Sequence, residues 1–466
     1  MRDARSARCA LDGPFPPSRT LSLLRSALTT LLVGLWLSIT ANAQESQQPK
    51  APIRALVGAR IEPVVGDPIQ NGVVLVENGL ILAVGDASNT AIPEGAVVVD
   101  LSGKVLMPGL VCTHSHVGGP QGADSSHPIQ PECRVLDSID VRDAGIAKAR
   151  AGGLTTVNVM SGSGHLLSGQ TLYVKLRKGD TVDDLALRLP DGSYAGGIKM
   201  ANGTNPQRNP PFPGTRAKSA ALIRALFLKA KRYYDRKLAA ENDESIEAPE
   251  IDLALEPLCD VLSGKRPVHH HTHRHDDILT VLRIADEFGY RVVLHHVSEA
   301  WKVADEIADA DVACSVILLD SPGGKIEAKD LRMENATLLA ERGVLTAFHT
   351  DDGITDSRYF LRMAAFGIRA GLSRQQALES LTIAGAEILE LEDRIGSIEV
   401  GKDADFCVLS GDPFSIYTKV EQTWIDGTVV FDRSLPEDRL AAEGGLGASD
   451  GQAWYLCCAQ KQEGGN

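Results

Sequence analysis

Histidine is concentrated in a few short stretches of this chain. Five of its twelve histidines lie within HHHTHRH (269–275), two stand in THSH (113–116), and others follow in VVLHHV (292–297) and AFHTDDG (347–353). Neutral imidazoles and carboxylates are the side chains that bind zinc and similar divalent ions. These stretches predict either a built metal centre or a loose metal-scavenging tract.

Strand alternation separates these histidines by role. His114 and His116 are two residues apart, so on a strand both point to the same face. In the histidine run, His269 and His271 share one face and His270 takes the other, whereas His273 and His275 fall in the following loop. Only His271 is both inward-facing and at the end of the strand.

The centre of the chain alternates short apolar strands with amphipathic helices. Strands are expected at 153–160, 196–201, 266–271, 290–297, 311–318 and 343–351. A helix is expected over 276–289, with Asp276 or Asp277 capping its start and Gly289 ending it. About 300 residues of this alternation favour an α/β fold with a TIM-like (β/α)8 barrel, whose active site lies at the carboxyl ends of the strands. No glycine-rich dinucleotide fingerprint supports an open doubly wound sheet instead.

Two β-rich pieces flank this centre. Residues 53–110 and 396–432 are rich in β-branched residues interrupted by Gly, Asn and Asp. Chain ends commonly lie close together, so these pieces are expected to build one small composite β-sandwich around a barrel over 111–395. Residues 433–466 turn to Gly, Ala, Glu, Gln and Ser, which indicates a flexible tail.

The first residues indicate export. Five Arg residues precede the apolar run 27–39, and ANA at 41–43 fits a signal peptide cleaved after Ala43, with 44–52 as a linker. A retained membrane anchor is the weaker interpretation, because the run is short. We therefore expect a periplasmic or secreted protein that has no membrane contact after cleavage.

The charge of the mature chain excludes some partners. Loss of residues 1–43 leaves 42 basic and 59 acidic residues, a formal charge of −17. Such a surface repels nucleic acid and anionic lipid. A small-molecule or short-peptide substrate is the better expectation, and enzymes of this fold frequently form homo-oligomers. Seven cysteines remain, an odd number that does not describe a disulfide framework.

Two long motifs resemble the metal-dependent amidohydrolase superfamily. MPGL (107–110) leading into THSH (113–116) is similar to the first barrel strand of that family. AFHTDDG (347–353), followed by GLSRQQALESLTIAGAEILELEDRIGSIEVGKDADFCVLSGDP (371–413), resembles the end of its barrel and the return into its β-domain. The resemblance covers most of 53–432 and is nearest to the imidazolonepropionase-like and dipeptidase-like members. It implies a barrel with a composite β-sandwich, as composition also indicates.

The resemblance implies a metal site at numbered positions. The strand 5 ligand of the family precedes the first apolar helix residue by seven positions, as His271 stands to Ile278, and His296 occupies the strand 6 position before VSEA. His295 is expected to pack outward against a helix. The implied ligand set is His114, His116, Lys199, His271, His296 and Asp351.

The bridging position at Lys199 has two interpretations. GGIKMANG (196–203) is similar to the strand that bears an N6-carboxylated lysine in binuclear members. A buried lysine is unfavourable unless neutralised or paired, and carboxylation between two metals resolves this. The alternative is a lysine at the barrel rim that bonds to a loop carbonyl.

Asp351 is expected to act twice, as a ligand and as the catalytic base and acid. It would take a proton from the attacking water and pass it to the leaving nitrogen. Asp352 is the alternative if the assignment is wrong by one residue. His273, His165 and Arg358 are the candidate substrate contacts, and Gln170 also lies in a loop that could line the pocket. For these loop residues the alternative is a structural role.

The predicted function is metal-dependent hydrolysis of a C–N bond in an amide, cyclic amide or dipeptide-like substrate, with two Zn²⁺ per chain. A deaminase is the alternative within the superfamily, but its members carry a Glu three residues after the strand 5 histidine, where this chain has Arg274. A non-catalytic periplasmic metal-binding protein is the alternative outside the enzymes. It would have no use for Lys199 or Asp351.

Overall fold

The computed structural model describes residues 52–120, 124–318, 326–352 and 354–444. The predicted signal peptide and all but one residue of the linker lie outside these residues, as do Cys457 and Cys458. Among the described residues, no helix has the length and hydrophobicity that crossing a membrane requires. The five cysteines described, namely Cys112, Cys133, Cys259, Cys314 and Cys407, are free thiols.

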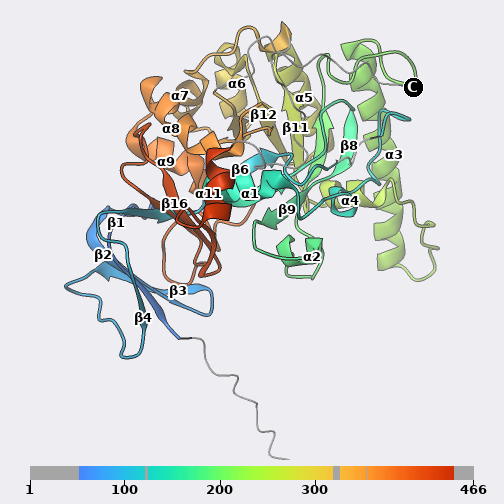
Figure 1. Ribbon diagram of the computed structural model, residues 1–466. Helices are drawn as coiled ribbons and strands as arrows, with labels where there is room; N and C mark the ends of the chain where they lie inside the picture. Colours follow the sequence, from blue (N-terminus) through green and yellow to red (C-terminus); the bar gives the residue numbers. More distant parts are fainter. Residues whose placement is uncertain (1–51, 121–123, 319–325, 353, 445–466) are drawn as a thin grey trace, which may run out of the picture. The chain divides into compact units, whose positions relative to one another are not determined.

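One eight-stranded sheet is built from both flanking pieces of the chain (Figure 1). In order its path runs β17-β16-β15-β5-β1-β2-β3, and β4 pairs with β1. The central join is antiparallel, with Phe406 of β15 opposite Pro108 of β5. The strands are β1 (Arg54–Ile61), β2 (Ile69–Glu77), β3 (Leu80–Asp86), β4 (Val97–Asp100), β5 (Val105–Pro108), β15 (Phe406–Leu409), β16 (Val420–Ile425) and β17 (Thr428–Asp432).

The central section contributes two further sheets. The larger has the order β14-β13-β12-β11-β10-β8, and its members from β10 to β14 pair in parallel. The smaller has the order β6-β7-β9. The strands are β6 (Leu110–Ser115), β7 (Leu154–Val159), β8 (Leu167–Gln170), β9 (Leu172–Lys175), β10 (Ile198–Ala201), β11 (Val268–Thr272), β12 (Val292–His296), β13 (Cys314–Val316) and β14 (Thr346–Phe348).

Strands of the central section are buried on both faces. Every residue of β6, β11 and β12 is buried, which is typical of parallel strands covered by helices on both faces. The backbone N–H of Asp351, beyond β14, donates to the carbonyl of His114 in β6 at 3.1 Å. This bond brings the ends of the two sheets together. The mixed α/β fold that the sequence predicts is therefore confirmed.

Helices alternate with these strands. The helices are α1 (Ala144–Ala151), α2 (Val182–Leu185), α3 (Arg216–Asn242), α4 (Glu256–Leu262), α5 (His275–Phe288), α6 (Ala304–Asp309), α7 (Asn335–Ala340), α8 (Phe360–Arg369), α9 (Arg374–Leu381), α10 (Ile383–Ile388) and α11 (Pro436–Glu443). Four 3₁₀ turns complete the described elements, namely η1 (Val135–Asp137), η2 (Ala300–Lys302), η3 (Ile326–Ala328) and η4 (Ser357–Tyr359).

Helix α5 shows how local sequence sets an element. It buries Ile278, Val281 and Ala285 at the three- and four-residue spacing of one helical face. It ends at Gly289, which takes the left-handed conformation with φ 70°, as predicted. The predicted aspartate cap is wrong: the helix begins at His275, and both aspartates lie in its first turn, where their charges favour the helix dipole.

The predicted flexible tail begins with structure. Residues 436–443 form α11, which starts with Pro436 in the first turn and buries Ala441. Proline is favoured in this position because it has no N–H to satisfy and a fixed φ. The flexible-tail prediction is therefore wrong for this helix, and residues 445–466 lie outside the described ones.

A buried ionic cluster ties β9 to the C-terminal part of the chain. The ammonium of Lys175 is fully buried and lies 2.6 Å from Asp403 Oδ2, 2.6 Å from Asp426 Oδ1 and 3.0 Å from Asp405 Oδ2. Arg177 and Arg394 pair with Asp426 and Asp403 at the edge of the cluster. Three cations thus face three carboxylates, which makes burial of so much charge tolerable.

Candidate metal centre

Histidines gather where the central strands end. His114, His271 and His296 lie on β6, β11 and β12, and their side chains are buried. His116 and Asp351 follow β6 and β14 and are partly open, with 24% and 18% of their side chains exposed. The structure thus brings together five of the six predicted ligands at the carboxyl ends of the strands, where barrel enzymes place their active sites.

His116 and Asp351 form the open side of the cluster. Asp351 Oδ1 lies 2.9 Å from His116 Nε2 and 3.3 Å from His114 Nε2. His116 Nδ1 lies 2.7 Å from the carbonyl of Met160, to which it can donate only as N–H. This bond fixes the tautomer that leaves Nε2 with a free electron pair, the arrangement that accompanies most metal-binding histidines.

A second set of side chains, namely His271, His296 and Lys199, belongs to the same cluster. The ring centroids of His271 and His296 are 4.4 Å apart, and His296 Nε2 is buried with no hydrogen bond from any described residue. Lys199, the sixth predicted ligand, is fully buried on β10, with its Nζ 3.4 Å from His114 Nε2. Lys199 therefore contacts the cluster through His114, which also contacts Asp351.

The donors fit a divalent transition ion. Ligands of one tetrahedral zinc, at about 2.0–2.1 Å from the ion, lie about 3.3 Å apart. The separations of 2.9 and 3.3 Å between Asp351 Oδ1 and the Nε2 atoms of His116 and His114 are of this size. Imidazole nitrogens together with a carboxylate suit zinc and its neighbours better than magnesium or calcium.

Burial keeps the imidazoles neutral. Desolvation lowers the pKa of His114 and of His296 well below the ordinary value, and the Asp351 carboxylate only partly opposes this. Burial raises the pKa of Asp351, but the surrounding histidines outweigh it and hold that pKa well below its usual range. At neutral pH His114 and His296 are therefore unprotonated and Asp351 is ionised, the forms that bind metal.

The prediction for His295 is wrong. Across the parallel pair β11 and β12, His271 lies beside His295 and Thr272 beside His296, so His295 shares the inward face of His271. Its ring lies 5.0 Å from that of His114. His296 also reaches the cluster because its backbone has φ 72°, which breaks the strand alternation at this residue.

His349 is a further member of the cluster that strand reasoning left without a role. It is fully buried, and its ring stacks on His114 with centroids 4.9 Å apart. Its Nε2 lies 3.2 Å from His296 Nδ1, and its Nδ1 lies 2.7 Å from Ser315 Oγ. The signal was present in the sequence, because His349 shares a strand face with Asp351.

The choice between Asp351 and Asp352 is clear from their contacts. Asp352 accepts hydrogen bonds from Ser115 Oγ at 2.7 Å and Thr350 Oγ1 at 2.8 Å, and from the hydroxyl of Ser357. Its carboxylate thus ties β6 to the segment after β14. Asp351 is the carboxylate that faces the histidines.

Of the candidate substrate contacts, His273 lies in the cluster. Its ring is 4.6 Å from His271 and stacks on His296 at 5.0 Å, and its Nδ1 is 2.7 Å from Ser298 Oγ. His273 is buried and lies next to the predicted ligands, just beyond the end of β11.

The other loop candidates have structural contacts. His165 Nε2 lies 2.9 Å from the carbonyl of Asp124, and the side-chain amide of Gln170 donates to Pro131. Arg358 forms a two-point pair with Asp356 and lines a cavity with Phe414. These placements favour the structural alternative, most clearly for Arg358.

The rest of the histidine run has separate surroundings. His269 lies below the cluster, bonded to Tyr173 and His295. His270 points to the opposite face and lines a cavity with residues of α3 and α5. His275 opens α5, and its Nδ1 lies 2.6 Å from Glu299 Oε2.

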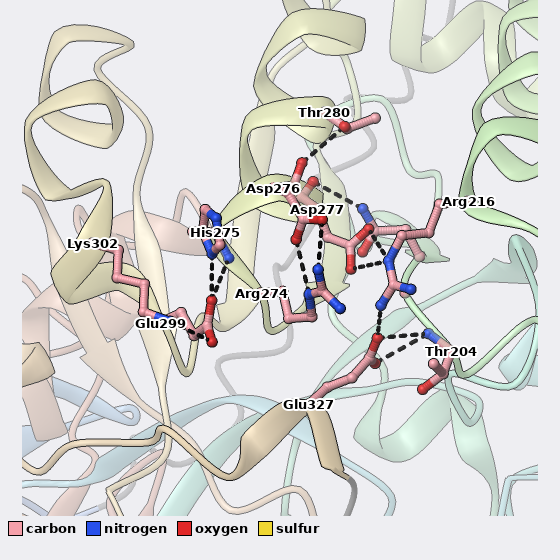
Figure 2. Close-up of polar contacts among 12 residues, drawn as sticks. Thr204, Arg216, Arg274, His275, Asp276, Asp277, Thr280, Glu299, Lys302 and Glu327 are labelled. Carbon is pink, nitrogen blue, oxygen red and sulfur yellow. Dashed lines mark hydrogen bonds and ion pairs between the residues drawn. The ribbon is translucent and has the colours of Figure 1, made fainter.

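Ion pairs hold the loops next to the cluster (Figure 2). Arg216 contacts both Asp277, at 2.9 Å, and Glu327, and the backbone N–H of Thr204 also donates to Glu327 at 3.0 Å. Glu299 joins His275 to Lys302. These pairs connect the segments that follow β10, β11, β12 and β13, so the surface beside the metal-binding residues is held by charge.

Comparison with known proteins agrees with this chemistry. Residues 298–431 match the model of the amidohydrolase family. An amidohydrolase of Thermotoga maritima with a solved structure is 37% identical, with a TM-score of 0.75, over 81% of this chain and 100% of that one. The imidazolonepropionase of Sphingopyxis alaskensis is 24% identical over 78% of this chain and 93% of its own length.

Another relative is longer than this chain. Amidohydrolase tasK of Hapsidospora irregularis is 28% identical over 396 residues, which is 78% of this chain. This chain spans 40% of that protein's length.

Proposed function

Because the chain belongs to the amidohydrolase family and is therefore a hydrolase of C–N bonds, we propose that it cleaves an amide, cyclic amide or dipeptide-like substrate with Asp351 as the proton carrier. The observation that carries this proposal is the contact of Asp351 Oδ1 with His116 Nε2 at 2.9 Å and His114 Nε2 at 3.3 Å. A carboxylate held among neutral imidazoles at the open side of the cluster can both bind an ion and accept a proton.

We assign two divalent ions, most simply Zn²⁺, to six side chains. His114, His116 and Asp351 would hold one ion, and His271 and His296 the other, with N6-carboxylated Lys199 between them. Carboxylation would turn a buried cation into an anion and remove its repulsion of the ions. When bound, the ions supply Lewis-acid polarisation of a carbonyl and a water nucleophile at neutral pH.

The side chains of the protein carry the proton. Asp351 accepts it from the attacking water and delivers it to the leaving nitrogen. Its low pKa makes the ionised form available at the start of the cycle. His273, fixed by Ser298 beside His271 and His296, is positioned to donate a hydrogen bond to a substrate group.

The deaminase alternative is less well supported. The position of the deaminase glutamate holds Arg274, whose guanidinium is bound by Asp276 at 2.8 Å and cannot shuttle protons at neutral pH. We therefore retain hydrolysis of an amide-type bond as the proposal.

The wider setting is proposed on the same basis. We propose that the two sheets of the central section close into a (β/α)8 barrel. We also propose that the chain is exported to the periplasm or beyond after cleavage following Ala43. Its substrates would be small molecules or short peptides, and it would not bind nucleic acid or membranes. A homo-oligomer is compatible with this scheme.

The test is a substrate screen combined with one isosteric substitution, Asp351→Asn. The mature protein is assayed against N-acyl amino acids, dipeptides and cyclic amides, and Asp351→Asn is compared with Asp191→Asn, an exposed aspartate paired with Lys265. Loss of a proton carrier lowers kcat by about 10²–10⁴-fold. Unchanged turnover in Asp351→Asn would remove the mechanism.

A further inference from the structure

Three buried histidines, namely His114, His295 and His349, form a further group within the cluster. One ring nitrogen each from His114, His295 and His349 lie within 4.8 Å of one another, and all three side chains are buried. Their ring centroids are 5.0, 4.9 and 5.7 Å apart. Imidazoles about one tetrahedral zinc have centroids about 5 Å apart, given Zn–N distances of about 2.0–2.1 Å.

His349 is held from outside this group. Its Nδ1 lies 2.7 Å from Ser315 Oγ, which in turn lies 2.5 Å from Thr113 Oγ1. If Nδ1–H donates to Ser315 and the serine hydroxyl donates onward to Thr113, all three groups are satisfied. His349 Nε2 then presents an electron pair to the group.

His295 is held in the same way by a longer chain. Its Nε2 lies 3.0 Å from His269 Nδ1, and His269 Nε2 lies 2.9 Å from the hydroxyl of Tyr173. A neutral imidazole carries one N–H, so the direction of the hydrogen bonds along this chain decides which nitrogen of His295 holds the hydrogen.

Two proton orders are possible along this chain. If protons run from Tyr173 toward the cluster, His295 carries its hydrogen on Nδ1, which is buried and has no hydrogen-bond partner among the described residues. If protons run from His295 toward Tyr173, Nδ1 carries an electron pair, and an electron pair facing other imidazoles is what a cation binds.

We propose that His114, His295 and His349 form a buried all-imidazole position for a divalent transition ion, separate from the position that His116 and Asp351 complete. His114 is shared: its Nε2 faces Asp351, and its Nδ1 is buried without a hydrogen-bond partner among the described residues. A neutral imidazole has only one electron pair, so ligation through both nitrogens makes His114 a bridging imidazolate and releases its N–H proton to solvent. Nitrogen-only ligation selects Zn²⁺, Co²⁺, Ni²⁺ or Cu²⁺ over Mg²⁺ and Ca²⁺. His269 and Ser315 are the positioning residues.

One contact competes with this assignment. His296 Nδ1 lies 3.2 Å from His349 Nε2, so a proton on His296 would be donated to the atom that the buried ion needs. His349 would then only support His296 as a ligand. The two arrangements predict different results when His349 is replaced. If His349 is a ligand, its loss lowers the number of ions bound; if it only supports His296, its loss weakens binding and leaves the number unchanged.

The experiment counts ions in the full chain. The protein is stripped with dipicolinate and titrated with Co²⁺ at neutral pH, with bound cobalt measured by elemental analysis and by visible absorbance. His295→Leu and His349→Leu are expected to bind one cobalt fewer than the wild type. The matched control is His270→Leu, a neighbouring buried histidine on the opposite face of β11, which is expected to bind the wild-type number.

Tyr173→Phe gives a readout that does not depend on removing a ligand. It is expected to keep the count and to weaken one cobalt by up to about 10–100-fold, the range for loss of a ligand's outer partner, because it loosens His269, which is the outer partner of His295. Wild-type counts in both leucine variants, or weaker binding at an unchanged count in His349→Leu, would overturn the inference.

The inference rests on the proposed function only in requiring that the chain bind divalent ions. A wild type that binds no cobalt and hydrolyses no amide overturns both. A wild type that binds cobalt and turns over substrate, while the count is unchanged in His295→Leu, overturns the buried position alone and leaves the proposed function intact. Circular dichroism of each variant verifies that it is folded.

Discussion

His116 Nε2 lies 2.9 Å from Asp351 Oδ1, and this contact joins the end of β6 to the end of β14. The backbones meet at the same place, since the N–H of Asp351 donates to the carbonyl of His114. Asp351 has φ 49°, a left-handed backbone that is uncommon for aspartate and turns the chain here. The position of the carboxylate is therefore set by main-chain bonding as well as by its ligand partners.

Replacement of His271 should remove metal and activity, and replacement of His275 should not. His271→Ala deletes a ring 4.4 Å from that of His296, whereas His275 contacts Glu299 at the start of α5. We expect His271→Ala to lose bound zinc and at least 100-fold in kcat/KM, by analogy with loss of a ligand. Zinc content by elemental analysis and turnover check this pair, and similar behaviour of the two variants would contradict the register given to β11.

Lys199 should depend on dissolved carbon dioxide if it carries a carboxylate. Lys199→Met keeps the length of the buried side chain but cannot be carboxylated, so we expect it to bind less zinc and lose most activity. Wild-type protein stripped of metal and bicarbonate should recover activity with zinc only when bicarbonate is added. A carbamate signal in the carbon-13 NMR spectrum after labelling with bicarbonate would verify this, and full recovery without bicarbonate would contradict it.

Lys175 should be important for stability and not for metal binding. Lys175→Met leaves Asp403, Asp405 and Asp426 without their shared buried cation. Breaking a buried ion pair from one side costs about 3–5 kcal/mol. Urea unfolding measures this loss, and Arg177→Gln, which removes a part-exposed partner of Asp426, should cost less than about 1 kcal/mol. Equal losses in the two variants would contradict the central role of Lys175.

Glu299 should contribute to stability above acidic pH. Burial raises its pKa, but hydrogen bonds from Lys302 and His275 outweigh this and lower the pKa from 4.5 to about 2. A carboxyl group with a depressed folded-state pKa stabilises the fold above its ordinary pKa, and this stabilisation is lost as the pH falls through the folded value. The unfolding free energy of wild type minus that of Glu299→Gln should therefore shrink between pH 5 and pH 2. A constant difference over this range would refute the assignment.

Sequence reasoning located most of the cluster because period-two alternation holds within a strand. It separates His269 and His271 from His270 correctly, since the run lies within β11 apart from its last residues. It failed at β12, where alternation forces His295 and His296 apart. The left-handed backbone of His296 brings both rings to one side, and nothing in the local residue types predicts a positive φ at a histidine.

Other differences have equally local causes. The sequence pattern predicts no role for His349, because the family motif selects Asp351 two residues later, and only the packing of His349 against His114 shows its place. Arg358 was a candidate because arginine can bind a carboxylate, but the carboxylate it binds is Asp356, two residues away. Loop residues reach the site or turn away from it through tertiary contacts, and these are not encoded in short-range pattern.

The position of β15 in the eight-stranded sheet has a consequence for incomplete chains. It lies between β5 and β16, and its partner Pro108 precedes Phe406 by nearly three hundred residues. A premature stop codon between those for Asp351 and Phe406 would leave β5 as an open sheet edge with unpaired backbone groups. Such edges pair with other chains, so truncated products of the gene should aggregate even when the residues that bind metal are all present.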